Sequence, residues 1–89
     1  MKRNENFILR RVADMTVIVP VGRETERFPG MISVNETGAF LWDLLETEQT
    51  LQTLAETLAR QYDADPERAR GDTEKFLEKL ERAGALWGL

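Results

Sequence analysis

Apolar residues change their spacing along this chain near Asn35. Before it, they cluster in short stretches that alternate or are rich in β-branched side chains, as is typical of strands. After it, they recur at intervals of three and four residues, as is typical of helices with one buried face. The pattern therefore predicts a β half followed by an α half, in one domain of the α+β class.

The β half contains three predicted strands separated by turn signals. The strands are expected at residues 7–12, 16–19 and 31–34. Ala13 and Asp14 form a plausible tight turn, and Pro20 ends the second strand because proline cannot donate a ladder hydrogen bond. Residues 22–30 are polar and contain glycine and proline, which predicts a connecting loop.

The α half contains three predicted helices, each with a start signal. They are expected at residues 36–45, 51–62 and from 66 to near Gly84, with a short final strand at Leu86 and Trp87. Asn35, Thr50 and Asp65 are the expected caps, because such side chains accept hydrogen bonds from the first turn. The stripes expected to face the core contain Leu41, Trp42, Leu45, Leu51, Leu54, Ala55, Leu58, Tyr62, Ala69, Thr73, Phe76, Leu77 and Leu80.

The composition argues against an enzyme that acts alone. The 89 residues include no cysteine and no histidine, which removes thiol nucleophiles, thiolate metal sites and the commonest general base. Ser33 is the only serine and has no histidine to activate it. We expect no cofactor and no metal.

Charge and hydropathy narrow the choice of partners. Residues 1–34 carry six basic and four acidic groups, whereas residues 35–89 carry six basic and twelve acidic groups. Because phosphate backbones require dense positive charge, the acidic helical half disfavours nucleic acid. No apolar run is long enough to span a membrane. Residues 1–6 are polar and are expected to be a flexible terminus, followed by a single domain at 7–89 in the cytoplasm.

The predicted third strand is the first candidate binding element. It is short and uncharged, and a three-stranded sheet leaves two strand edges open. An open edge offers unpaired N–H and C=O groups, which can bind a peptide as an added strand. An ordinary short edge without a ligand fits the pattern equally well.

The order of several short motifs resembles a known family. Val34-Asn35-Glu36-Thr37-Gly38, followed by Leu41-Trp42, resembles the strand-to-helix signature of the pyrroloquinoline quinone biosynthesis protein D family. The later residues that match in order and spacing are Leu54, Ala55, Leu58, Tyr62, Asp63, Asp72, Phe76, Leu77, Leu80, Gly84 and Leu86.

This resemblance implies a winged helix-turn-helix-like fold and a binding function. Members of the family recognise the leader segment of a ribosomally made precursor peptide and present it to a modifying enzyme, often a radical S-adenosylmethionine protein. The implied peptide-binding residues are Met31, Ile32, Ser33 and Val34 of the third strand, with Arg68, Asp72, Lys75, Phe76 and Lys79 of the third helix.

Two other functions remain open. A winged helix can also insert a helix into the major groove of DNA, which steeply salt-dependent binding would reveal. Alternatively, the open edge can pair with a second copy of the chain and form a homodimer. The resemblance favours a non-catalytic peptide-binding adaptor over both.

Overall fold

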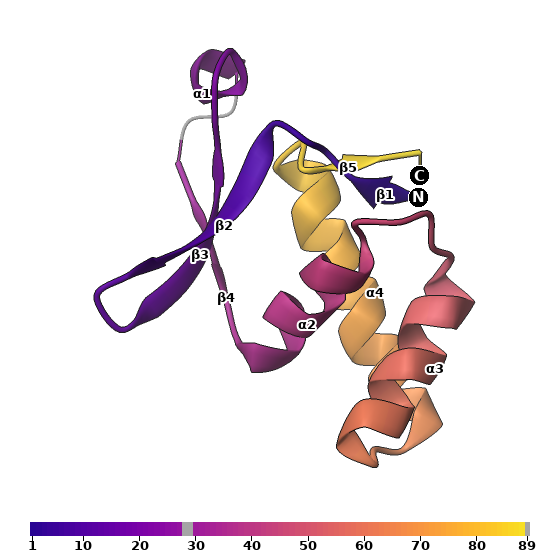
Figure 1. Cartoon of the computed structure of the whole chain (residues 1–89). Helices are drawn as coiled ribbons and strands as arrows, with labels where there is room; N and C mark the ends of the chain where they lie inside the picture. Colours follow the sequence, from indigo (N-terminus) through magenta and orange to yellow (C-terminus); the bar gives the residue numbers. More distant parts are fainter. Residues whose placement is uncertain (28–29, 89) are drawn as a thin grey trace.

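A computed structural model describes residues 1–27 and 30–88 (Figure 1). The elements are β1 (Lys2–Arg3), β2 (Phe7–Val12), β3 (Met15–Pro20), α1 (Glu24–Arg27), β4 (Ile32–Val34), α2 (Glu36–Leu44), α3 (Leu51–Tyr62), α4 (Pro66–Arg82) and β5 (Leu86–Trp87). The predicted α+β class is confirmed, since an antiparallel sheet of β2, β3 and β4 precedes α2, α3 and α4. None of the described helices has the length and apolar character needed to cross a membrane.

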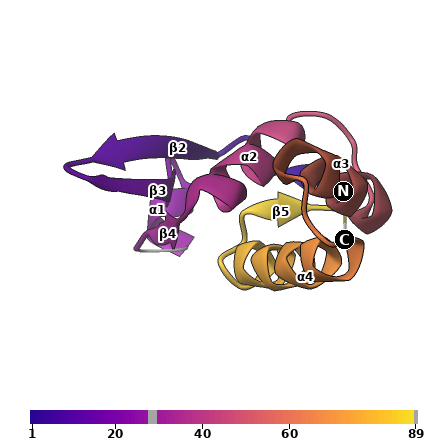
Figure 2. The same cartoon turned by 90° about the horizontal axis from the view of Figure 1, so that it is seen from below.

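The sheet has the strand order β2-β3-β4, so β2 and β4 are its outer strands. The β2–β3 hairpin turns at Ala13, whose φ of 55° lies in the region that favours glycine, and projects away from the helices (Figure 2). Register pairs Ile18 with Leu9 on one side and with Ile32 on the other. Directly opposed residues share a face, so these three side chains point to the same side of the sheet.

The core lies between this face and the helices. Phe7 and Ile18 are buried in it, and Ile32 and Val34 pack against it. The helices add the buried side chains Leu41, Trp42, Leu45, Leu54, Leu58, Ala69, Leu77 and Leu80. The stripe predicted for the first helix, which consists of Leu41, Trp42 and Leu45, is thus confirmed in full. Phe76 of α4, which was also predicted to face the core, is only partly buried.

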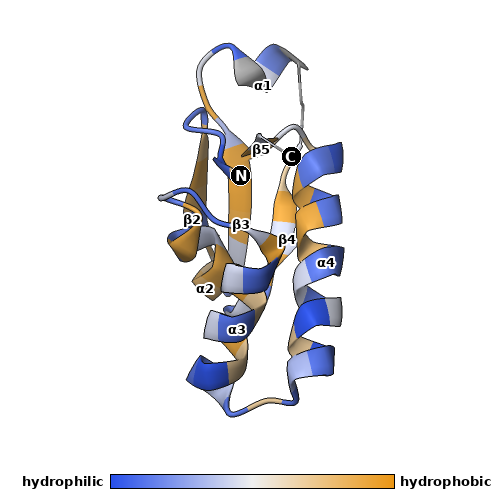
Figure 3. Ribbon diagram, turned by 90° about the vertical axis from the view of Figure 1, so that its right-hand side faces the viewer, coloured by the Kyte–Doolittle hydropathy of each residue, from blue (hydrophilic) through white to orange (hydrophobic). Residues whose placement is uncertain are grey.

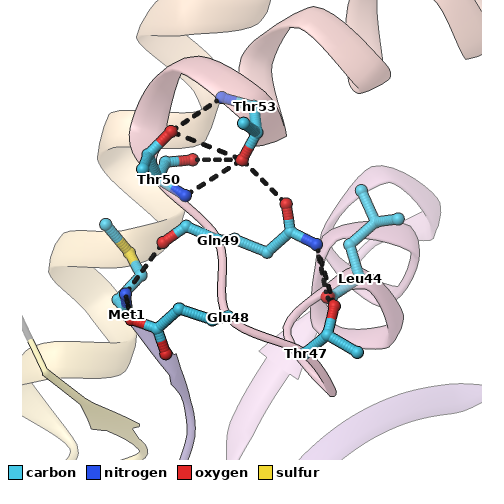
Figure 4. A network of polar contacts seen from close by, with 7 residues as sticks. All are labelled: Met1, Leu44, Thr47, Glu48, Gln49, Thr50 and Thr53. Carbon is cyan, nitrogen blue, oxygen red and sulfur yellow. Dashed lines mark hydrogen bonds and ion pairs between the residues drawn. The ribbon is translucent and has the colours of Figure 1, made fainter.

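Two of the three predicted helix caps are confirmed. The Asn35 side chain accepts from the backbone N–H of Gly38 at 2.9 Å. Thr50 and Thr53 form a reciprocal capping box at the start of α3 (Figure 4). Asp65 occupies the N-cap position of α4 as predicted, but its side chain makes no capping bond. Pro66 still begins α4, because the first helical N–H has no partner within the helix in any case.

The predicted connecting loop at residues 22–30 contains one helical turn, α1, which the sequence analysis did not predict. In α1, the N–H and the Oγ1 of Thr25 both donate to the carbonyl of Gly22, at 3.2 and 2.7 Å. A single turn stabilised by local bonds leaves no apolar periodicity for sequence analysis to detect. Residues 28–29 of the predicted loop lie outside the described residues.

The N-terminal residues, expected to be flexible, contact the core in this structure. β1 pairs with β5 and thereby gives the predicted final strand its partner. The Met1 and Gln49 backbones exchange hydrogen bonds of 2.7 and 2.8 Å, which dock the terminus on the α2–α3 connection (Figure 4). Asn4 is buried; its backbone N–H donates to Ala85 O, and its Nδ2 donates to Gly84 O at 3.0 Å.

Replacing Asn4 tests whether this docking stabilises the fold. Asn4→Ala leaves the Gly84 carbonyl without its side-chain donor, and we expect the free energy of unfolding to fall by about 1–3 kcal/mol in urea denaturation. Asn6→Ala is the matched control, because Asn6 is exposed and only its backbone N–H bonds to Asn4. Its effect should stay within about 0.5 kcal/mol. Equal effects of the two variants would contradict a docked terminus.

A glycine in the first turn of α2 permits close packing beside β4. A Cβ added at Gly38 would lie 3.1 Å from Phe76 Cε1 of α4 and 3.2 Å from Val34 Cβ. Both distances are shorter than ordinary van der Waals contact between carbon atoms. The absence of a side chain at Gly38 therefore lets the end of β4, the start of α2 and the Phe76 ring converge.

Two helical glycines offer a matched test of this packing. A Cβ added at Gly71 of α4 meets no atom within 4 Å. Gly71→Ala should therefore raise the free energy of unfolding by about 1 kcal/mol through helix propensity alone. Gly38→Ala should give no such gain in the same urea titration, because crowding against Phe76 and Val34 offsets it. Equal stabilisation by both substitutions would contradict the close contact.

Candidate functional site

A groove separates β4 from α4 and has a volume of about 650 Å³. Figure 3 shows β4 between β3 and α4, with strand and helix running side by side. The groove is lined by Ser33, Val34, Asn35, Thr37, Gly38, Leu41, Arg68, Asp72, Lys75, Phe76 and Lys79. The structure thus brings together all five residues predicted on α4 with two of the four predicted on the strand.

Met31 and Ile32 do not line this groove. The predicted strand at residues 31–34 is observed as Ile32–Val34, so Met31 precedes it, with 60% of its surface exposed. Ile32 pairs with Ile18 and packs against the core. Neither side chain belongs to the lining of the groove, and their place in the peptide site stays a prediction.

Helical spacing explains why α4 presents one row of side chains to the groove. Arg68, Asp72, Lys75 and Lys79 follow one another at intervals of four, three and four residues, which keeps them on one face. Phe76 lies beside this row. The adjacent face contains Ala69, Thr73, Leu77 and Leu80, all of them buried. Packing of that face against the core fixes the rotation of α4 and so directs the row toward β4.

The base of the groove is apolar. Val34 from β4, Leu41 from α2 and the partly buried ring of Phe76 supply its apolar side chains. Gly38 lies among them and leaves room that a larger residue would fill. This part of the groove can accept an apolar side chain, whereas the row on α4 offers polar contacts above it.

Ser33 provides the main-chain groups that face the groove. Lys79 Nζ donates to the Ser33 carbonyl at 3.1 Å, and Lys79 belongs to α4, which lies on the side of β4 away from β3 (Figure 3). In an antiparallel pair, the N–H and C=O of one residue point to the same side. Both backbone groups of Ser33 therefore point to the open edge, while those of Ile32 and Val34 pair with β3.

The groove is locally positive although the chain has a net charge of −4. Arg68, Lys75 and Lys79 line it together with one carboxylate, that of Asp72. Among the described residues, the ion pairs of α4 are Arg70–Glu74 and Glu78–Arg82, which use other positions of the helix. In the part of the chain that the structure describes, these three cations thus form no ion pair within α4, and their charge exceeds that of Asp72.

Sequence reasoning missed four residues that line the groove. Asn35, Thr37, Gly38 and Leu41 were identified as part of a strand-to-helix signature, without a place in the site. Glycine in the first turn of a helix was the available signal, because it often marks a close approach between elements. The described residues contain no group of three or more side chains suited to hold a metal ion.

Comparisons with known proteins give both a family and a similar fold. The family model for coenzyme PQQ synthesis protein D (PqqD) matches residues 16–86. A solved structure described as TbiB1 in complex with the TbiA(beta) leader peptide is similar over 100% of this chain and 98% of that chain. Its TM-score is 0.76 at 19% sequence identity, which shows the shared fold. No curated protein matches this chain.

The family match covers most of the chain, including β3 from Thr16 onward, β4, the helices and the residues that line the groove. The motif order around Asn35 and along α4 had indicated the same family. The chain belongs to the PqqD family.

Proposed function

We propose that this protein is a non-catalytic adaptor that binds the leader segment of a ribosomally made precursor peptide as an added strand on β4. The observation that carries the proposal is the outward direction of the Ser33 N–H and C=O beside a groove. Membership of the PqqD family supports it, as does the similar fold of TbiB1, which is described in complex with a leader peptide.

The groove has one wall from β4 and one from α4, and each can make a different kind of contact with a peptide. Main-chain bonds at Ser33 give affinity that depends little on the peptide sequence, and side-chain contacts with α4 give selectivity. The apolar base at Val34, Leu41 and Phe76 accepts an anchoring side chain of the peptide. A disordered leader loses conformational entropy when it binds, so the expected affinity is moderate.

Presentation to an enzyme is the second part of the proposal. An adaptor that holds the leader while it contacts the modifying enzyme raises the effective concentration of the segment to be modified. The resemblance described above suggests a radical S-adenosylmethionine enzyme as this partner. Addition of the protein should therefore accelerate modification of the full precursor and leave modification of a leaderless precursor unchanged.

A titration of isotope-labelled protein with a candidate leader peptide tests the binding step. We expect saturable NMR shifts confined to β4, the start of α2 and the groove face of α4. The same titration with duplex DNA tests the alternative function. Saturable, steeply salt-dependent shifts with DNA and none with the peptide would contradict the adaptor, and a dimer that occupies the β4 edge would do so as well.

A proline at Ser33 tests strand addition directly. Ser33→Pro removes the N–H that faces the groove but keeps the β3–β4 ladder, because proline is tolerated on an edge strand where its nitrogen faces outward. We expect leader binding to weaken by at least roughly tenfold, the value of one lost hydrogen bond of about 1.4 kcal/mol.

Ser33→Ala is the matched control, because it keeps the backbone N–H and should bind like the wild type. Ile32→Pro is less informative, since the Ile32 N–H belongs to the ladder with β3 and its loss destabilises the sheet itself. Unchanged peptide affinity in a folded Ser33→Pro variant would rule out pairing at this edge.

A further inference from the structure

The open edge of β4 is closed by a side chain in the free protein. Lys79 Nζ reaches from α4 to the Ser33 carbonyl at 3.1 Å, between residues 46 positions apart in the sequence. Ser33 is the central residue of β4 and the one whose backbone points outward. Lysine at a strand edge is a recognised way to prevent unwanted pairing with another chain.

A peptide strand added to β4 competes with this contact. To extend the sheet, the peptide must donate a backbone N–H to the Ser33 carbonyl from the open side of the strand. Lys79 Nζ donates to the same oxygen from that side. The ammonium group must therefore move, and it then donates to water or to an anion as its new partner.

Helix and strand geometry define where such anions would lie. Lys75 and Lys79 are one turn apart on α4, about 6 Å along the helix axis. Alternate residues of an extended strand lie about 6.6–6.8 Å apart and point to the same side. Since β4 and α4 run side by side, an added strand can place two side chains, separated by one residue, opposite these two cations (Figure 3).

We propose that Lys79 blocks the β4 edge in the free protein and, once displaced, pairs with a carboxylate of the added strand. The domain therefore selects leader segments with two acidic residues separated by one position. The inference rests on the proposed function and names its peptide class. Lys75 is the expected partner of the second carboxylate. Lys79 thus opposes neutral strands and favours acidic ones.

Selection from a displayed library of random peptides supplies the probe. Wild-type protein should enrich peptides with an acidic residue at two positions separated by one. A selected peptide and its version with both acidic residues replaced by the corresponding amides are then titrated against the wild type, Lys79→Met and Lys75→Met. Arg70→Met is the matched control, because Arg70 lies on α4 but pairs with Glu74 away from the groove.

We expect the wild type to bind the acidic peptide at least roughly tenfold more tightly than its amide version, since one charge-assisted hydrogen bond alone gives about that factor. Lys79→Met should reduce that ratio toward one, through weaker binding of the acidic peptide and equal or tighter binding of the amide version. Lys75→Met should also reduce the ratio, but without tighter binding of the amide version, and Arg70→Met should leave the ratio unchanged.

The outcomes separate this inference from the proposed function. One contrary result is that Lys79→Met keeps the full preference for the acidic peptide, and another is that it binds the amide version more weakly than the wild type does. Either result would overturn the proposed role of Lys79 but leave the proposed peptide binding intact. If selected peptides bind without any acidic preference, the assigned peptide class is wrong. If the selection enriches no peptide and a candidate leader also fails to bind, the proposed function itself fails.

Discussion

The short junction between β4 and α2 determines the geometry of the groove. A single residue, Asn35, separates strand from helix, and its side chain accepts from the Gly38 N–H and the Thr37 Oγ1, both at 2.9 Å. The hydrogen-bonded junction fixes where β4 ends, and the missing side chain at Gly38 lets Phe76 of α4 approach it. With a longer or looser junction, β4 and α4 would have no fixed separation and the open edge would have no defined opposite wall.

The distribution of charge along α4 follows from the same arrangement. The chain is acidic overall, but its groove presents Arg68, Lys75 and Lys79 against the single carboxylate of Asp72. On other positions of the helix, acidic and basic residues pair with each other one turn apart. The net charge of the chain therefore does not describe the charge of the groove. Burial of one face of α4 decides which of its charged side chains line the groove.

The termini support the helices at the other end of the molecule. β1 and β5 form a separate two-stranded sheet, and Asn4 joins the segment before β2 to the chain that follows α4. Arg3 extends this contact, since its guanidinium lies 5.5 Å from the centre of the Trp42 ring and donates to the Trp42 carbonyl. These contacts hold the ends of α2 and α4 together, and so they stabilise the two helices that form the groove with β4.

Local signals in the sequence determined most of the fold. β-Branched stretches, helical periodicity and the caps Asn35 and Thr50 act over a few residues, so they predicted the three strands, the three main helices and the α+β class. The resemblance then indicated which residues of α4 line the groove. Only the tertiary structure decided that Ser33 rather than Ile32 faces the open edge, that Gly38 and Leu41 help to form the groove, that Lys79 contacts the Ser33 carbonyl at that edge, and that β1 pairs with β5. Each of these depends on strand register, helix rotation or a contact between distant residues, which are settled when the elements pack together and which no local pattern records.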